Sequence, residues 1–565
     1  MRPRLDDATR AAEGVKEMGA RGAVGVGGGP RASLRGRRKC LFGATKRRAT
    51  RGVEWRRASS HLLERRPSEL GQGPRRFVSS ACSAGEGEGG APSGGEESTS
   101  ASASSAAVIG KGIAALLPPL ASPYDGEIFK LALPALFSVL LDPLMSIVDT
   151  AIIGRIGVNE LAGTGLAGLI WATFTVALFQ FLATAITPLV SGANARQDGE
   201  AISRTICIGL WLAVSIGSIL FVLKFVGAEW FLRNFFTSSE EVVSNSMRYL
   251  DARIFSVHAT LTQLVCIGVL RGLKDTKTIL YATVIANALN CCLDCLFIFK
   301  FDWGVSGAAA SSTISTTLSC ALLLGSLLRS RQVAPRDFFP PPKLREATPV
   351  LSAGVALSMK SMVTMYTVGL ASQAIAQLGA MSLAAHEIIK QLFFFCYIAV
   401  EPLSVAGQSL IAECLGKKEV YQARMIAYRL VQLAVSLGVI MGAVVYTLGP
   451  RIVHIFTKED AVIGITFTVI GVVAMFQPLD ALMLAQEGVL LGAREHAYIS
   501  RSVIATSLTC FLALYTMTKT LALPYNLLHV WLCVKILTVG RITFSSARLY
   551  LSKHSPIFVR SSAHA

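Results

Sequence analysis

Long apolar runs separated by short polar loops recur from residue 128 to about residue 548. About 20 apolar residues in a helix are enough to cross the hydrocarbon core of a bilayer. Twelve runs have at least that length, and we expect each to be one membrane-spanning helix. They lie at approximately 128–153, 161–192, 205–227, 248–271, 278–299, 304–328, 347–376, 380–413, 422–447, 460–488, 497–517 and 525–548. The pattern predicts an all-α polytopic membrane protein.

The sharpest break in this pattern is the segment 329–346, which contains Pro335 and the run Pro340–Pro342. Segments this rich in proline are extended and semi-rigid. We therefore expect six helices on each side of it. The expected parts are an N-lobe at 125–328, the linker at 329–346, a C-lobe at 347–550 and a tail at 551–565.

The two halves share short motifs. Residues 212–219 read LAVSIGSI and residues 433–440 read LAVSLGVI, while Val269–Gly272 resembles Val489–Gly492, both at an offset close to 221. Internal repeats of six spans are typical of transporters, with the substrate site where the halves meet. Because six is even, the halves run in the same direction across the membrane and form two pseudo-symmetric lobes.

The first residues have a different composition. Residues 1–82 are rich in Arg, Ala, Gly and Ser and end in VSSAC, which is typical of a plastid transit peptide, although several acidic residues depart from that type. Residues 83–124 are Gly/Ser/Glu/Ala-rich and predict a disordered linker. The alternative is a solvated basic tail that stays attached. We expect a multi-pass protein of the plastid (chloroplast) envelope, with the mitochondrial inner membrane as the alternative.

The net charge of +18 comes mostly from that N-terminal segment, since the first 80 residues hold 20 Lys/Arg and 7 Asp/Glu. This location argues against a nucleic-acid partner. Loops after the even-numbered spans, with the C-terminus, hold about 18 Lys/Arg against about 8 on the other side. Both termini should therefore face the basic side of the membrane.

Two carboxylates interrupt the first span. Asp142 and Asp149 are seven residues apart and so return to nearly the same face of a helix. A carboxylate inside a membrane is costly and marks a functional site by default. The alternative is that the pair only holds neighbouring helices. Pro134 and Pro143 should bend this helix around a water-filled cavity.

A second polar stripe lies in the fifth span, where Asn287, Asn290 and Asp294 share one face. The next span offers Ser311, Ser312 and Thr313. An Asn one turn from an Asp can hydrogen-bond its carboxyl group. Three cysteines adjoin Asp294, but no second CxxC and no histidine accompany them, so they do not predict a metal site.

The C-terminal half carries its own polar groups: Glu401 beside Pro402, and Gln477 and Asp480 beside Pro478. Proline next to an intramembrane carboxylate predicts discontinuous helices that expose backbone at a midplane site. Lys360 has three interpretations: a partner for a carboxylate such as Asp142, a receptor for an anionic substrate, or a side chain that reaches the membrane surface. The chain lacks nucleophile-elbow and Walker motifs, so no enzyme is indicated.

These residues resemble the multidrug and toxic compound extrusion (MATE) family. The opening motif MSIVDTAIIG at 145–154 is similar to the family's, and Asn290 with Asp294 matches its DinF-like branch. That resemblance implies an N-lobe cation site of Asp149, Asn290 and Asp294, completed by Ser312 or Thr313. Residues 401–409 look most like plant plastid members of the DETOXIFICATION type.

The resemblance further implies a twelve-helix MATE/MOP fold and a secondary antiporter. It would export a small molecule, either an organic cation or an aromatic or carboxylic acid, in exchange for H⁺ or Na⁺. Asp142, Lys360, Glu401, Gln477 and Asp480 would be secondary coupling or cavity residues. We expect a monomer in the lipid bilayer without a cofactor. The alternatives are a related flippase of amphipathic precursors and a membrane-embedded enzyme.

Overall fold

The computed structural model describes residues 122–235, 239–330, 338–339, 341–520, 525–552 and 555–557. The chain divides into two compact units, Met1–Gly95 and Glu96–Ala565, and all the described residues belong to the second. The expected transit peptide, nearly all of the disordered linker and most of the C-terminal tail lie outside the described residues.

The described residues are helical, without a strand among them. The helices are α2 (Asp125–Ile153), α3 (Val158–Trp171), η1 (Ala172–Ala177), α4 (Phe181–Ala195), α5 (Gly199–Phe235), α6 (Glu240–Arg253), η2 (Ile254–Ser256), α7 (Val257–Gly272), α8 (Thr276–Asp294), η3 (Cys295–Lys300), α9 (Gly304–Arg329), α10 (Leu344–Ala376), α11 (Ala380–Gly416), α12 (Val420–Phe456), α13 (Asp460–Gly492), α14 (His496–Tyr515), η5 (Thr516–Thr520), α15 (Leu527–Ser546) and η6 (Ala547–Leu551). Several short segments continue their neighbours, so α3 to α4, for example, make one long span. Each of the twelve predicted spans has its helix.

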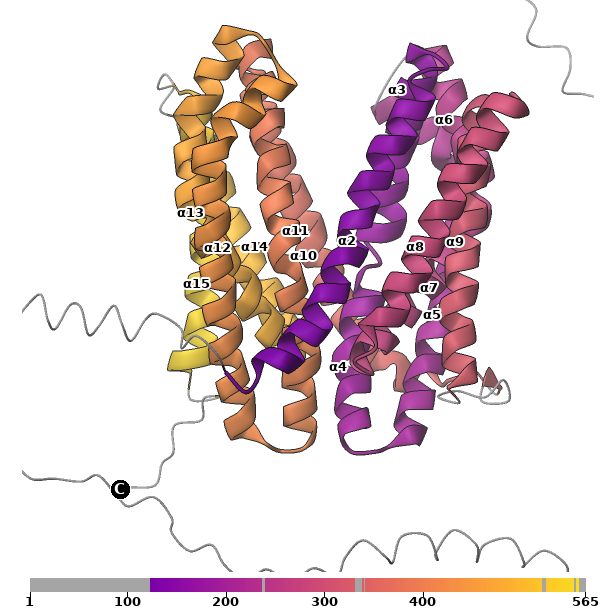
Figure 1. The fold of residues 1–565 in the computed structure, drawn as a ribbon, viewed down its shortest axis with the longest axis vertical. Helices are drawn as coiled ribbons and strands as arrows, with labels where there is room; N and C mark the ends of the chain where they lie inside the picture. Colours follow the sequence, from indigo (N-terminus) through magenta and orange to yellow (C-terminus); the bar gives the residue numbers. More distant parts are fainter. Residues whose placement is uncertain are drawn as a thin grey trace, which may run out of the picture. The chain divides into compact units, whose positions relative to one another are not determined.

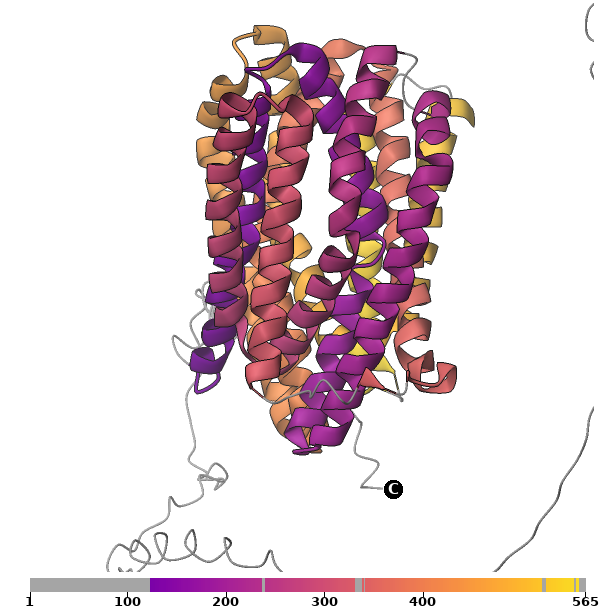
Figure 2. The same ribbon diagram turned by 90° about the vertical axis from the view of Figure 1, so that its right-hand side faces the viewer.

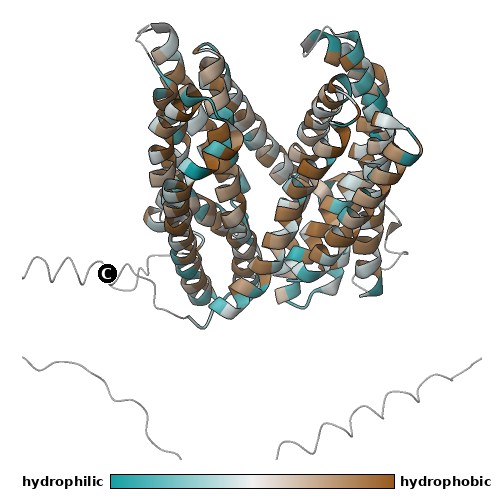
Figure 3. Cartoon of the chain, turned by 45° about the horizontal axis from the view of Figure 1, so that its top comes forward, coloured by the Kyte–Doolittle hydropathy of each residue, from teal (hydrophilic) through white to brown (hydrophobic). Residues whose placement is uncertain are grey.

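Eleven of these spans are long and apolar enough to cross a membrane. The twelfth, α10, occupies the predicted range but is less apolar, because Ser, Thr and Lys360 interrupt it. Hydrophobic residues cover the middle of the helices, and hydrophilic ones gather at the helix ends (Figure 3). The chain is a multi-pass membrane protein.

The helices form two bundles. The N-lobe contains α2 to α9 and the C-lobe contains α10 to α15 with η5 and η6 (Figure 1). Seen from the side, the N-lobe helices run roughly parallel to one another (Figure 2). In each lobe the second span packs on the fourth, α4 on α7 and α11 on α13. This shared arrangement is the internal repeat that the sequence motifs predict.

Glycines make this packing possible at equivalent places in both lobes. A Cβ on Gly268 of α7 would lie 2.6 Å from the carbonyl oxygen of Ala183, and a Cβ on Gly488 of α13 would lie 2.6 Å from that of Ser404. No real side chain tolerates that distance, so the helices touch backbone to backbone only because these positions lack a side chain. The two contacts are about 220 residues apart in the chain.

Charged side chains join the lobes at the end where the described chain begins. Arg429 of α12 donates two hydrogen bonds of 2.7 Å to the Asp125 carboxylate in the first turn of α2. Lys274, between α7 and α8, pairs with Glu413 of α11. The hydrogen bond from Lys417 to Glu413 in turn raises the pKa of Lys417. We call the pairs Asp125–Arg429 and Lys274–Glu413 the inter-lobe latch.

Beside the latch, α4 and α11 approach each other closely. Ser191 of α4 donates a hydrogen bond of 2.7 Å to the carbonyl oxygen of Ser409. A Cβ on Gly416 would lie 2.8 Å from the carbonyl oxygen of Gly192. The lobes are thus closed against each other on the side of the termini, whereas their helices diverge toward the opposite end (Figure 1).

The expectation of discontinuous helices at proline is wrong for all three helices concerned. α2, α11 and α13 continue through Pro143, Pro402 and Pro478. Neighbouring helices can support a proline-containing helix in a membrane protein. α2 does change direction along its length (Figure 1), as its two prolines predict. The irregular backbone is found instead in π-helical turns, including η1 and η3.

Candidate functional site

The N-lobe candidate site is built where α8 passes into the π-helical turn η3. Asp294 is the last residue of α8 and is buried, as is Asn290 one turn earlier. Ser311 of α9 joins them: the Asn290 amide donates a 3.1 Å hydrogen bond to its hydroxyl oxygen, and that hydroxyl donates to Asp294 Oδ1. π-helical turns occur frequently at functional sites because they re-aim side chains out of the helical register.

Asp149 of α2 faces this group. Its carboxyl lies close enough to that of Asp294 for the two to interact directly. Asp149 Oδ1 and Asp294 Oδ2 are both buried and neither has a hydrogen-bond partner among the described residues. Two neighbouring carboxyls with buried, unpartnered acceptor atoms are stabilised by a proton or another cation that lies between them or on one of them. The structure thus brings Asp149, Asn290 and Asp294 together, as the family resemblance implies.

The residue that completes this group differs from the expected one. Ser312 and Thr313 are one and two positions too far along α9: Ser312 faces Tyr249, and Thr313 donates a 3.0 Å hydrogen bond to the carbonyl oxygen of Ala252. Both contacts join α9 to α6 instead of to α8. Ser311 occupies the place next to Asp294, because the side chains of consecutive helical residues point about 100° apart.

Asp142 lies elsewhere than Asp149. It is exposed in the protein, and the charge that acts on it is the carboxyl of Glu401 in α11. Glu401 in turn interacts with Arg271 at the end of α7. The suggested pairing of Asp142 with Lys360 is wrong, since Lys360 has a different partner. Asp142 and Arg271 of the N-lobe thus lie near enough to Glu401 of the C-lobe for their charges to act on it.

In the C-lobe, Lys360 of α10 is bound to a glutamate that the sequence analysis did not single out. Its Nζ donates a 2.7 Å hydrogen bond to Glu487 Oε2 of α13. Arg541 of α15 donates to the other oxygen, Oε1, at 2.8 Å from Nε and 2.5 Å from a terminal nitrogen. Three elements therefore meet at one carboxylate held between two cations. With all three groups ionised, the cluster has a net charge of +1.

Asp480 also has a cation of its own. Lys535 of α15 donates a 2.6 Å hydrogen bond to Oδ2, and Thr538, one turn later, donates a 2.7 Å hydrogen bond to Oδ1. The ammonium group also lies over the ring of Phe393, 4.5 Å from its centroid. Gln477, one turn before Asp480, is buried with its amide nitrogen unpartnered. Asp480 is thus neutralised in place, unlike Asp149.

Sequence reasoning missed six residues that the structure adds: Tyr249, Arg253, Glu487, Lys535, Thr538 and Arg541. It named Ser311 with Ser312 and Thr313, but the cation site was expected to use one of the latter two. A signal was present for the charged ones. Arg253, Glu487, Lys535 and Arg541 all fall inside predicted apolar spans, and a charge there is a functional-site hypothesis by default. For Ser311 there was none, because three consecutive hydroxyl residues offered three directions.

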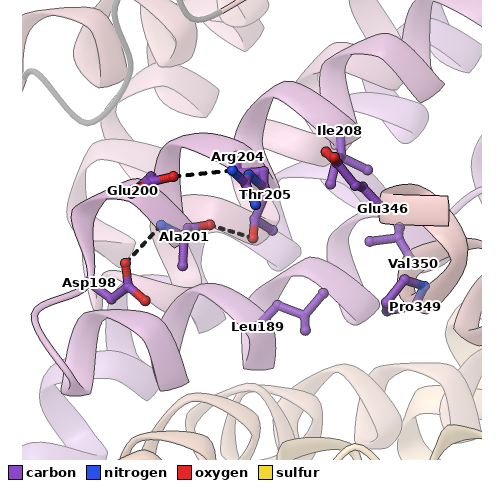
Figure 4. A pocket seen from close by; sticks show the side chains of 10 residues that line it. All are labelled: Leu189, Asp198, Glu200, Ala201, Arg204, Thr205, Ile208, Glu346, Pro349 and Val350. Carbon is purple, nitrogen blue, oxygen red and sulfur yellow. Dashed lines mark hydrogen bonds and ion pairs between the residues drawn. The ribbon is translucent and has the colours of Figure 1, made fainter. Parts of the chain in front are cut away.

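A second candidate region is a pocket of about 380 Å³. It is lined by α4 and α5 of the N-lobe and by the start of α10 of the C-lobe. Its charged lining residues include Arg204 and Glu346 (Figure 4), and Arg204 pairs with Glu200 of its own helix at 3.1 Å. Glu346 stands 221 positions after Asp125, at the equivalent place in the second lobe. Asp125 is bound by Arg429 of the other lobe, whereas no ion pair of the described residues engages Glu346. None of the candidate site residues lines this pocket.

Comparison with known proteins identifies the family. The MatE family profile matches residues 134–296 and 353–516, one block in each lobe and more than half of the chain together. The chain belongs to the MATE family. It is accordingly a multidrug and toxic-compound efflux transporter that acts on small molecules in a membrane, not an enzyme.

Two relatives and one solved structure illustrate the similarity. Protein DETOXIFICATION 42 of Arabidopsis thaliana is 29% identical over 460 residues, covering 70% of this chain and 86% of the relative. Protein DETOXIFICATION 44, chloroplastic, of the same plant is 27% identical over 436 residues, covering 75% and 82%. The structure "Outward-facing conformation of a multidrug resistance MATE family transporter of the MOP superfamily" has a TM-score of 0.67 at 17% identity, covering 74% of this chain and 93% of that one. The predicted family and fold class are confirmed.

Proposed function

We propose that this protein is a secondary antiporter that exports an organic solute across a plastid membrane in exchange for H⁺ or Na⁺. The observation that carries the proposal is the pair Asp149, which is half-buried, and Asp294, which is buried, each with a buried and unpartnered carboxyl oxygen. Such a pair has to take up a cation when it is shielded from water, and it can release that cation when the cavity opens. Cation occupancy and lobe orientation are thereby linked.

The mechanism is alternating access. In the state described here the lobes are joined on the side of the termini by the inter-lobe latch. Binding of the coupling ion at Asp149 changes the contacts between α2 and α8, and α2 also packs against α11 of the other lobe. α2 is therefore the element through which a change at the cation site reaches the interface between the lobes.

The solute cavity is proposed to lie between the lobes, with Asp142 and Glu401 on one side and the Lys360–Glu487–Arg541 cluster on the other. An organic cation would be held by the carboxylates, and an aromatic or carboxylic acid by the positive C-lobe cluster. The plastid location is supported by the composition of residues 1–82 and by relatives named chloroplastic. A monomer suffices, because one chain supplies both lobes and the whole candidate site.

Efflux from proteoliposomes tests the proposal. The purified protein is reconstituted, a fluorescent organic cation or a labelled aromatic acid is loaded, and a pH or Na⁺ gradient is imposed. We expect gradient-driven efflux in the wild type and its loss in Asp149→Asn, which keeps the shape of the side chain and removes its charge. The matched control is Asp302→Asn, which changes an exposed carboxylate of the same lobe in the loop before α9. Equal efflux from wild type and Asp149→Asn would refute the coupling role of Asp149.

A further inference from the structure

A half-buried arginine lies near the Asp149 carboxyl of the N-lobe site. Arg253, the last residue of α6, donates a 3.1 Å hydrogen bond to Thr316 Oγ1 of α9, and its guanidinium carbon lies 5.0 Å from the centroid of a ring of Trp171. These two contacts hold the guanidinium inside the lobe. Its Nε is buried and has no hydrogen-bond partner among the described residues.

The positive charge of Arg253 acts on Asp149, the carboxyl that the proposed function assigns to cation coupling. It also interacts with the Tyr249 hydroxyl. Another titratable group near both carboxyls is Cys291 of α8. Tyrosine and cysteine are ordinarily neutral at neutral pH. The permanent charges are therefore one guanidinium and two carboxylates, so the empty site has a net charge of −1.

Arg253 changes which ion can supply the missing positive charge. A proton attaches to a single carboxyl oxygen and turns it into a hydrogen-bond donor, which the neighbouring carboxylate accepts. A sodium ion needs several oxygen ligands at once, and here it would have to collect them next to a fixed guanidinium in a poorly screened interior. The Ser311 hydroxyl is not free to bind Na⁺, because it accepts a hydrogen bond from the Asn290 amide and donates one to Asp294.

We propose that Arg253 is a specificity-determining residue that makes H⁺ the coupling ion and excludes Na⁺. The inference rests on the proposed antiport function and specifies its ion. Arg253 serves as a built-in cation for one of the two carboxylates, so that only one charge is left for the transported ion to neutralise. A site of the same carboxyls without this arginine would have a net charge of −2 and would attract Na⁺.

Binding of ²²Na⁺ to the purified protein in detergent tests this inference without a transported solute. We expect no saturable binding in the wild type and saturable binding in Arg253→Met, because the variant removes a positive charge that repels Na⁺ from the site. Arg253→Lys keeps the charge and should behave like the wild type. The matched control is Lys224→Met, which removes a buried cation from α5 of the same lobe, where it pairs with Asp251. It should bind no Na⁺.

Efflux under each gradient provides the second measurement. The wild type should respond to a pH gradient and not to a Na⁺ gradient, and Arg253→Met should gain a response to Na⁺. If Arg253→Met does not fold, Arg253→Gln, which retains donors for Thr316, replaces it. Saturable Na⁺ binding by the wild type, or equal binding by wild type and variant, would overturn the inference. If no gradient drives efflux, the antiport proposal fails, while the ²²Na⁺ comparison still decides the role of Arg253.

Discussion

The Asp125–Arg429 pair is predicted to stabilise the state that is closed on the side of the termini. The pair joins the first turn of α2 in the N-lobe to α12 in the C-lobe, so it can exist only while these lobes touch. Its two parallel hydrogen bonds are 2.7 Å long, and the side chains are only 20% and 6% exposed. Removing the pair should therefore raise the population of the state that is open on that side.

The size of the effect follows from the geometry. Hydrogen bonds to charged groups contribute about 1.5–3 kcal/mol, and partial exposure places this pair at about 2 kcal/mol. Since 1.4 kcal/mol corresponds to a factor of ten, the equilibrium between the two states should shift by roughly 30-fold. A shift of this size is large enough to change which state dominates.

Hydrogen–deuterium exchange of the reconstituted protein measures the shift. In Arg429→Met, exchange should speed up in the peptides at the ends of α4 and α11, which cover each other on the closed side. The reverse pair, Asp125→Arg with Arg429→Asp, should restore slow exchange. If the single variants exchange like the wild type, or if the reversed pair exchanges as fast as Arg429→Met, the pair does not hold the lobes together.

Three further outcomes are expected. Gly488→Leu should lower the free energy of unfolding by about 1–3 kcal/mol or more, because its side chain would meet the backbone of α11, and thermal unfolding in detergent measures the loss. Lys535→Met should destabilise the protein by about 3–5 kcal/mol because it leaves Asp480 buried and unpaired, whereas the double variant with Asp480→Asn should recover most of this loss. Ser311→Ala should weaken gradient-driven efflux more than Ser312→Ala does, because only Ser311 contacts Asp294.

Each of these predictions has a control and a contradicting result. Gly464→Ala is the control for the glycine, since a Cβ there has nothing within 4 Å. Unfolding temperatures that fall equally in both glycine variants would contradict the packing argument. Additive losses in the Lys535 and Asp480 variants would show that the two groups do not depend on each other. If Ser312→Ala weakened efflux more than Ser311→Ala does, Ser312 and not Ser311 would complete the cation site.

The helical fold could be predicted because its cause is local. In a bilayer every backbone group of a spanning segment has to be hydrogen-bonded within the protein, so an apolar run of sufficient length forms a helix wherever it occurs. For the same reason most helix ends in the structure lie within a few residues of the ends predicted for the spans. The repeat was also visible, since Val269–Gly272 and Val489–Gly492 serve equivalent backbone contacts.

Part of the candidate site could be predicted on the same principle. Asp149, Asn290 and Asp294 are polar groups within apolar segments, and a group that is costly in a membrane needs a partner. The helical periodicity then placed Asn290 and Asp294 on one face of α8. That Asp149, from a helix more than a hundred residues earlier, would face them came from the family resemblance.

The partners themselves were decided by the tertiary structure. Spacing in the sequence does not determine how a helix is rotated about its axis against its neighbour. On α9 the consecutive residues Ser311 and Ser312 point about 100° apart, so this rotation decides which of them contacts Asp294. Lys360 binds Glu487 from 127 positions away, and Arg429 binds Asp125 from 304 positions away. Apolar periodicity determined which segments became helices. Packing between the helices, which depends on close backbone contacts and on satisfying buried charges, determined which charges meet.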